Sequence, residues 1–590
     1  MTDRVDTPND SSLSRLFAEA FVDREATWFC LAGGALLFEA GEPADQLYYL
    51  RAGRLGVFRS DEDGDIQFLG VIRPGEPVGE MALIAGGAHS ARVVALRDSE
   101  ILGLPREAFF DACEADPTVM TELARLMIRR SRQAGQREAV GDPSVFGFLA
   151  VAEGVNVRPL ADRVAQEISA LGYSSLVVGI EAVNVAPEWF SDAERSHDFV
   201  LYVAENADLG WRQVVARQVD RLFRVARGGQ PPPQSVAATS TQARPLQAQQ
   251  LVDLILLHPR DADHASGSEA WQDAVQPARI FHLRRGVAGD VRRLARVITG
   301  RSVGLVLSGG GARAYAHVGA IRALRERGVP IDFVCGASMG AIVGAGVAMG
   351  WSNEELTRRI REAFVDTSPV DDIALPLLAM TQGRKVRERL AWHFGDTRIA
   401  DLWIPFFCVS SNLTTGAYHM HRRGLLRDAL RATVALPGIL PPATDGTDVL
   451  VDGAVLKNFP ADLMRAAHNG PVIGVDVTRG RSITAADVAR PESVWRWLAS
   501  GQWRRGPPIV SLLMRAATVS TGRDLAASRE ATDLLVTPDL GDVEIRDWSA
   551  FEPAEQAGYA ATIAALDLLH APVTELRRRP KIQAPAAIAT

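Results

Sequence analysis

The stretch of residues 332–341, which reads Asp-Phe-Val-Cys-Gly-Ala-Ser-Met-Gly-Ala, constrains the fold of this chain more than any other. An apolar run leads directly into the motif Gly336-x-Ser338-x-Gly340, and small residues continue after it. A strand, a sharp turn and a helix are the context in which this motif presents a nucleophilic serine. The glycines make room for a strained turn, and the helix N-terminus favours negative charge that develops near Ser338. The alternative is a glycine-rich turn with an incidental serine, since the chain contains 51 glycines.

Three successive glycines lie one strand–helix unit upstream. The apolar run Val303–Ser308 predicts a buried strand, and Gly309, Gly310 and Gly311 follow it before an amphipathic helical pattern over Ala314–Arg327. Such a loop exposes backbone N–H groups, which can bind a phosphate or form an oxyanion hole for a serine nucleophile. A phosphate loop would need Gly-Lys-Ser/Thr, which is missing here. We therefore favour the oxyanion hole.

A candidate base lies downstream of both motifs. Asp452 follows the short apolar run Leu450-Val451 and precedes Gly453-Ala454. The patterns G-G-G-x-R, G-x-S-x-G and D-G-A, in this order, resemble those of the patatin-like phospholipase family, which implies a C-terminal α/β patatin-like hydrolase domain. The resemblance implies a catalytic dyad of Ser338 and Asp452, an oxyanion hole at Gly309–Gly311 and a supporting role for Arg313 in that loop.

The alternative catalytic arrangement is a Ser–Asp–His triad, because His468 and His570 follow Asp452 in the chain. His468 ends the helical pattern Ala461–Ala467, where a histidine usually interacts with the last carbonyl groups. His570 lies near the C-terminus. We therefore predict the dyad, and we expect burial to raise the pKa of Asp452, since a carboxylate with an ordinary pKa is a weak base.

Length and composition limit the class of protein. A chain of 590 residues predicts several domains, and a net charge of −7 gives no support to nucleic-acid binding. No run reaches the roughly 18 apolar residues of a membrane span, and the N-terminus has no signal-peptide pattern. The four scattered cysteines have neither disulfide nor zinc spacing. We expect a cytoplasmic protein, or one bound peripherally to the inner face of the membrane, with no metal and no nucleic acid.

Short strands separated by glycine turns follow a helical pattern at residues 12–28. They predict a β-barrel or jelly roll, and residues 106–138 are helical in pattern. The expected strands are Ala35–Glu39, Gln46–Arg51, Arg54–Arg59, Ile66–Ile72, Ser90–Leu96 and Glu100–Pro105. Gly41-Glu, Arg51-Ala-Gly and Val78-Gly-Glu-Met-Ala-Leu resemble the cyclic-nucleotide-binding domain family.

That second resemblance implies a nucleotide site at Gly79, Glu80, His89 and Ser90. His89 stands where the family has an arginine that pairs with the cyclic phosphate, and a neutral imidazole makes a weaker contact. Arg92 lies three residues on, which on a strand is the opposite face. The barrel is therefore either a sensor with a cyclic nucleotide as candidate regulator, or a module that has lost its ligand and binds a partner. We favour the second hypothesis.

Residues 143–290 alternate strand and helix patterns, which predicts a parallel sheet covered by helices. No Gly-Lys-Ser/Thr follows the first strand, so we interpret this region as a spacer. The expected domains are 12–138, 143–298 and 301–572, followed by a disordered tail at 573–590. The order of these parts resembles bacterial relatives of neuropathy target esterase. It implies a phospholipase or lysophospholipase that acts on membrane lipids and needs no cofactor.

Two stretches are candidates for peripheral membrane contact. Ile373–Met380 with Gly383–Arg389, and Val494–Leu498 with Trp503–Arg505, combine apolar and basic residues. The alternatives are a core helix for the first and a cover over the acyl pocket for the second.

A catalytically silent scaffold is the non-enzyme hypothesis, but the serine, the aspartate and the glycine loop are all intact. A transcription regulator would need a helix-turn-helix directly after the barrel, where an α/β pattern begins instead.

Overall fold

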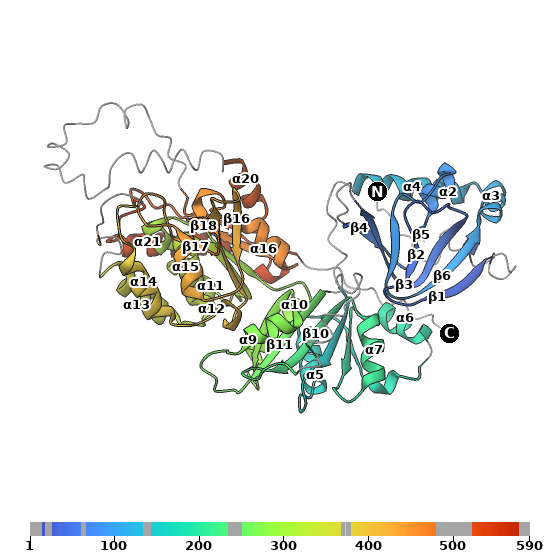
Figure 1. Cartoon of the computed structure of the whole chain (residues 1–590), viewed down its shortest axis with the longest axis horizontal. Helices are drawn as coiled ribbons and strands as arrows, with labels where there is room; N and C mark the ends of the chain where they lie inside the picture. Colours follow the sequence, from blue (N-terminus) through green and yellow to red (C-terminus); the bar gives the residue numbers. More distant parts are fainter. Residues whose placement is uncertain are drawn as a thin grey trace.

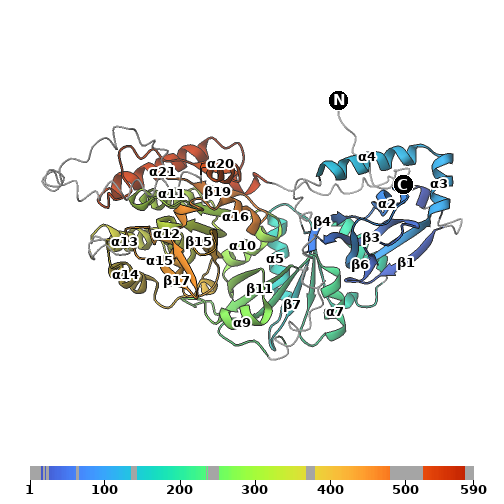
Figure 2. The same cartoon turned by 45° about the horizontal axis from the view of Figure 1, so that its top comes forward.

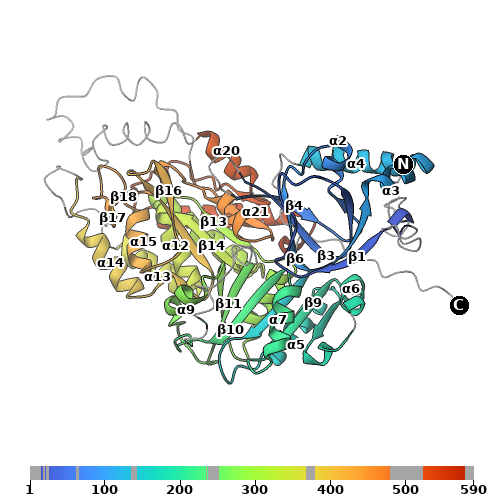
Figure 3. The same ribbon diagram turned by 45° about the vertical axis from the view of Figure 1, so that its right-hand side comes forward.

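The structure is a computed structural model of the 590-residue chain. It describes residues 15–17, 20, 26–60, 66–133, 143–185, 187–233, 236, 251–366, 372, 379–478 and 522–577. The described residues form three sheets, whose strands lie within residues 27–105, 145–284 and 304–536. Figure 1 shows the N-terminal barrel in blue and the C-terminal unit, in yellow-green to red, on opposite sides, with the green middle sheet between them. The turned views of Figure 2 and Figure 3 agree.

The N-terminal unit is an antiparallel jelly roll, as predicted. Its strands pair in the order β1-β6-β3-β4, with β2 on β6 and β5 on β3. The strands are β1 (Thr27–Leu31), β2 (Leu36–Phe38), β3 (Gln46–Ser60), β4 (Ile66–Ile72), β5 (Pro77–Val78) and β6 (Arg92–Pro105). The helices are α2 (Glu80–Ala85), α3 (Arg106–Ala115) and α4 (Thr118–Gln133).

Three details of this unit differ from the prediction. The two expected strands within residues 46–59 form the single strand β3, and the two within residues 90–105 form β6. The strands stay continuous because their pairing shifts register around Gly53. The expected helix over 106–138 is interrupted at Asp116, which is extended before a proline. The expected N-terminal helix does not extend to residue 28, since β1 begins at Thr27.

The middle unit is a parallel sheet, also as predicted, in the order β12-β11-β10-β7-β9-β8. Its strands are β7 (Val145–Ala150), β8 (Ser175–Val178), β9 (Phe199–Ala204), β10 (Arg221–Arg227), β11 (Leu251–His258) and β12 (Arg279–Arg284). Its helices are α5 (Arg158–Ala170), α6 (Pro187–Ser196), α7 (Leu209–Gln218), α9 (Ser268–Val275) and α10 (Ala288–Ile298). Strand β10 was not expected, because its arginines hide the apolar pattern. Arg221 is nevertheless buried, since it pairs with Asp253 of β11.

The C-terminal unit is a mixed sheet in the order β17-β18-β15-β14-β13-β19-β20, with β16 on β15. Its strands are β13 (Gly304–Leu307), β14 (Phe333–Ala337), β15 (Phe406–Asn412), β16 (Ala417–His421), β17 (Ala443–Asp445), β18 (Asp448–Val451), β19 (Val472–Val475) and β20 (Leu534–Val536). Its helices are α11 (Tyr315–Glu326), α12 (Ser338–Ala348), α13 (Asn353–Phe364), α14 (Arg384–Phe394), α15 (Leu426–Thr433), α16 (Ala461–Ala467), α20 (Gly522–Glu530) and α21 (Phe551–Asp567).

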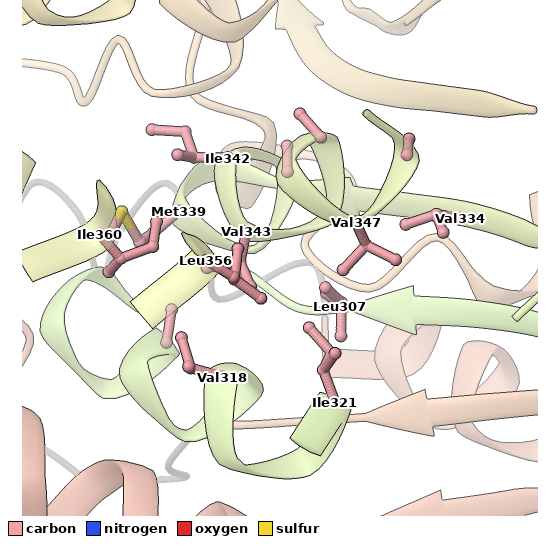
Figure 4. Packing of buried hydrophobic residues seen from close by; sticks show 14 of the residues in the cluster. Leu307, Val318, Ile321, Val334, Met339, Ile342, Val343, Val347, Leu356 and Ile360 are labelled. Atoms are coloured by element: carbon pink, nitrogen blue, oxygen red, sulfur yellow. The ribbon is translucent and has the colours of Figure 1, made fainter. Parts of the chain in front are cut away.

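Helix α12 is the centre of the C-terminal core. Every residue from Met339 to Ala348 is buried, which the small side chains of this helix permit. Figure 4 shows Leu307, Val318, Val334 and Leu356 packed around it. The helix that begins at Ser338 is therefore held on all sides by strands and helices.

Buried polar contacts join the three units. Arg97 of β6 pairs with Glu194 of α6 at 2.6 Å, and Arg54 of β3 pairs with Asp220 at 2.6 Å. Arg296 of α10 pairs at 2.6 Å with Asp332, the residue before β14. One hydrophobic cluster also contains side chains of both the middle and the C-terminal sheets. The strand that leads to Ser338 is thus anchored on the middle unit.

Some expectations concern segments at the edge of the described residues. Val573–Glu575, which we assigned to a disordered tail, form a short 3-10 helix in which Val573 is buried. Residues 373–378 of the first candidate membrane segment and all of the second lie outside the described residues, whereas the basic part of the first, Gly383–Arg389, forms the N-cap and the beginning of α14. Within the described ranges, we find no helix with the length and apolarity needed to cross a bilayer.

Candidate active site

Ser338 lies at the turn between β14 and α12, in a strained conformation. Its φ of 52° is one of only two positive values among the non-glycine residues described. The turn needs glycine on both sides, because a Cβ on Gly340 would lie 2.4 Å from the carbonyl oxygen of Ser308, and one on Gly336 would lie 2.8 Å from the backbone N of Ala341. Strain of this kind persists only where the surroundings determine it and is common at active sites. The local geometry is that of a nucleophile elbow.

Asp452 accepts a hydrogen bond from the hydroxyl group of Ser338. The Ser338 Oγ donates to Asp452 Oδ2 at 2.7 Å, and the backbone N–H of Ala454 donates to Oδ1 at 2.8 Å. The aspartate is only 1% exposed, and this burial raises its pKa to about 6, although the two hydrogen bonds oppose the shift. A carboxylate with a raised pKa is a better base near neutral pH.

Two hydroxyl groups that the sequence did not indicate hold this pair in place. Thr433 Oγ1 accepts the backbone N–H of Ser338 at 2.9 Å and donates to the carbonyl of Val409. Ser411 Oγ donates to the carbonyl of Asp452 at 2.9 Å. Both hydroxyls thereby connect the two loops to strand β15. Neither Ser411 nor Thr433 belongs to the three motifs that indicated the site.

The glycine loop stands directly beside the serine. A Cβ on Gly309 would lie 3.0 Å from the Cβ of Ser338, so only glycine allows this approach. The N–H of Gly309 donates to the carbonyl of Asn458 at 3.2 Å, which leaves it engaged. Among the described residues, the N–H groups of Gly310 and Gly311 have no hydrogen-bond partner.

Arg313 lies next to the glycine loop, whereas the two candidate histidines lie away from Asp452. Arg313 Nε donates to the carbonyl of Val543 at 3.0 Å, from the turn that follows the glycine loop. His468 stacks on Phe333, at the end of β14 away from Ser338, and burial lowers its pKa to about 3. His570 is exposed after α21. Neither histidine is a hydrogen-bond partner of Asp452, so the geometry favours the dyad over the triad.

The residues of the expected nucleotide site lie together in the barrel, but they do not form a cationic site. His89 is 6% exposed, stacks on Phe38 with ring centroids 3.6 Å apart and approaches Gly79. Burial lowers the pKa of His89, which keeps the ring neutral. Glu80 is buried, and Ser90 is exposed. Arg92 pairs with Glu39 at 3.2 Å instead of serving a phosphate.

Comparison with known proteins defines the class. Residues 305–465 match the family model of the patatin-like phospholipases, and residues 30–116 match the cyclic nucleotide-binding domain. With this fold, these matches define an enzyme of the phospholipase or esterase class. An uncharacterized NTE family protein of Mycobacterium tuberculosis is 33% identical over 549 residues, which cover 90% of each chain. The chain described here belongs to the NTE family.

Animal proteins match over most of this chain but are much longer. Patatin-like phospholipase domain-containing protein 7 of Rattus norvegicus is 28% identical over 93% of this chain and 46% of its own length. Neuropathy target esterase sws of Drosophila melanogaster is 26% identical over 91% of this chain and 42% of its own length. The present chain therefore spans less than half of these two relatives.

Proposed function

We propose that this protein is a serine esterase that hydrolyses acyl ester bonds of phospholipids or lysophospholipids. The observation that carries the proposal is the 2.7 Å hydrogen bond from Ser338 to a buried aspartate whose pKa is raised to about 6. The match to the patatin-like phospholipases supports a lipid substrate. Contact with a membrane surface is part of the proposal, since such substrates are found in bilayers.

The reaction proceeds by two-step acyl transfer. Asp452 takes the proton of Ser338 as the oxygen attacks the ester carbonyl carbon, and the carbonyl oxygen becomes an oxyanion. The N–H groups of Gly310 and Gly311 donate to that oxyanion, and each such donor contributes roughly 3 kcal/mol in comparable enzymes. Asp452 then gives the proton to the departing alcohol, and the acyl group stays on Ser338. In the second step a water molecule attacks the acyl carbon while Asp452 takes its proton, and Asp452 returns that proton to Ser338 Oγ as the bond to the acyl group breaks and the fatty acid leaves.

The raised pKa of Asp452 makes a pH prediction. The base must be ionised to accept a proton, so kcat/KM for lysophosphatidylcholine should rise with pH through a midpoint near 6 and stay level above it. The choline and phosphate groups of this substrate do not titrate in that range. A steady-state series from pH 4.5 to about 8.5 measures the midpoint. A midpoint near 4, the ordinary value for an exposed aspartate, would contradict the proposed role of its burial.

We further propose that the barrel acts on the esterase as a docked module and not through a bound cyclic nucleotide. The buried pairs Arg97–Glu194 and Arg54–Asp220 support docking, and the neutral, stacked His89 argues against phosphate binding. We expect no saturable binding of cyclic AMP or cyclic GMP in a calorimetric titration of the full chain. His89→Arg should gain binding, because it restores a bidentate partner for the phosphate. Saturable binding by the unmodified protein, with a change in kcat, would show that the sensor is intact.

A further inference from the structure

The segment Val543–Trp548, here called the strap, lies far outside the patatin match yet contacts the glycine loop. The backbone N–H of Ala312 donates to the carbonyl of Ile545 at 2.8 Å. Arg313 Nε donates to the carbonyl of Val543 at 3.0 Å, and Tyr315 Oη donates to that of Trp548 at 3.4 Å. Three of the four residues that follow Gly311 thus donate hydrogen bonds to main-chain carbonyls about 230 residues away in the chain. The family model, which ends at residue 465, does not contain these partners.

Ile545 meets the loop at the glycine that carries a free N–H group. A Cβ on Gly311 would lie 2.2 Å from the carbonyl oxygen of Ile545 and 2.6 Å from its Cγ2. Gly311 has a φ of 57°, a conformation that other residues seldom adopt. The side chain of Ile545 is 48% exposed, which is unusual for an isoleucine that packs against an active-site loop. The strap therefore determines the conformation of Gly311 and leaves an apolar side chain beside it.

The strap is itself held firmly at its C-terminal end. The Trp548 ring stacks on Phe364 with centroids 5.9 Å apart, and α21 begins three residues later. Helix α21 packs on α11 so closely that a Cβ on Gly319 would lie 1.8 Å from the carbonyl oxygen of Glu555. Helix α11 directly follows the turn of the glycine loop. Loop and strap are therefore parts of one rigid assembly.

We propose that the strap positions the oxyanion hole and that Ile545 contacts the substrate beside the reacting carbonyl. The proposal rests on the function proposed above. The oxyanion lies at hydrogen-bond distance from the N–H groups of Gly310 and Gly311. The acyl chain and the alcohol group are attached to the same carbon as the oxyanion, so they lie within van der Waals reach of the Ile545 side chain, which touches Gly311. Val543, Ile545 and Trp548 act through their main-chain carbonyls, and Arg313 is the positioning residue that connects them to the loop. The apolar side chain of Ile545 fits the first methylene groups of an acyl chain.

Arg313→Met tests the positioning role, because methionine keeps an apolar stem of similar length and removes the donor to Val543. Oxyanion donors act in the transition state, so kcat should fall about 10-fold to 100-fold while KM stays within a factor of about two. The rate constant for labelling of Ser338 by a fluorophosphonate should fall in parallel, since the phosphoryl oxygen occupies the same hole. This second readout needs no lipid turnover, so a wrong lipid substrate would not be mistaken for a failure of the strap. A purely structural role for Arg313 would lower the melting temperature and leave kcat per folded molecule unchanged, which would overturn the proposal.

Tyr315→Phe is the second variant for this role, in case Arg313→Met does not fold, since it removes only the hydroxyl that reaches Trp548. We expect a several-fold fall in kcat with unchanged KM. For the side chain, Ile545→Ala should change the ratio of kcat/KM between butyryl and acetyl p-nitrophenyl esters by about 10-fold, because the acetyl group lacks the first methylene groups that Ile545 contacts. Leu568→Ala is the matched control, because Leu568 is 78% exposed at the end of α21. An unchanged ratio in Ile545→Ala would show that this side chain does not touch the substrate.

Discussion

Asp452→Asn is expected to abolish esterase activity and, at the same time, to stabilise the fold. The amide cannot accept the proton of Ser338, so the rate should fall by about 10⁴-fold or more, as it does when a member of a catalytic triad is removed. Burial holds the folded-state pKa of Asp452 at about 6, above its unfolded value of 3.8. The ionised form is therefore disfavoured in the fold, by at most about 3 kcal/mol for two pKa units. Asparagine removes that penalty.

The sign of the stability effect depends on pH. A group whose pKa is raised on folding contributes stability below its unfolded pKa, and this contribution is lost as the pH rises through the folded pKa. The free energy of unfolding of Asp452→Asn should therefore exceed that of the unmodified protein by about 1–3 kcal/mol at pH 8. The difference should shrink toward pH 5. Urea unfolding at the two pH values measures it.

Ser338→Ala is the matched control for this prediction. It should be equally inactive, but it removes the hydroxyl that donates to the Asp452 carboxylate and should lower stability at pH 8 by about 1 kcal/mol. The two inactive variants should therefore shift in opposite directions at pH 8. More than about 1% residual turnover in Asp452→Asn would exclude the dyad, given the rate loss expected for a general base. A loss of stability in that variant at pH 8 would contradict the penalty assigned to its burial.

Gly311→Ala should have the second largest effect. The added methyl group would lie 2.2 Å from the main-chain oxygen of Ile545, and backbone cannot move aside as a flexible side chain can. The loop must therefore shift, so that the N–H group of Gly310, of Gly311 or of both no longer points at the oxyanion. Loss of one such donor usually lowers kcat by about 10²-fold to 10³-fold. We expect a loss of this size in kcat for fatty-acid release, with Ser338 and Asp452 still hydrogen-bonded.

Gly328→Ala controls for backbone strain. Gly328 has a φ of 67°, close to that of Gly311, but no atom lies within 4 Å of its added Cβ. This variant should lose about 1 kcal/mol of stability through strain and keep the kcat of the unmodified protein. If Gly311→Ala and Gly328→Ala lower kcat equally, the loss in Gly311→Ala results from general destabilisation and not from the oxyanion hole. A kcat within a few-fold of the unmodified value in Gly311→Ala would remove Gly311 from the oxyanion hole.

Local patterns in the sequence predicted the fold class, whereas the pairing of Ser338 with Asp452 was implied by the resemblance to the patatin-like phospholipases. Buried strands such as β9 are continuous apolar runs, which is the pattern of a strand in a parallel sheet covered on both faces. Strand β10 was missed, because tertiary ion pairing with Asp253 allows arginine to lie in a buried strand. The prediction divided β3 at Ala52-Gly53 and β6 at residues 97–99, and the two strands meet there at irregularities of register that the sheet accommodates.

The parts of the site that the sequence did not predict depend on contacts over long distances in the chain. The strap meets the glycine loop through main-chain carbonyls, which every residue has, so no residue type marks it. Thr433 is one hydroxyl at the end of a helix, and only the fold brings it to the backbone of Ser338. The unequal roles of the three glycines could not be read from the motif either, because Asn458 engages Gly309 from another loop.

The most direct test of the esterase is fatty-acid release from lysophosphatidylcholine by the purified full chain, with Ser338→Ala measured beside it. A fluorophosphonate probe applied to both proteins reports the reactivity of the serine without a lipid. The proposed function predicts release and labelling by the unmodified protein, and neither by the variant. Equal release by both proteins, or the absence of both release and labelling in the unmodified protein, would contradict it.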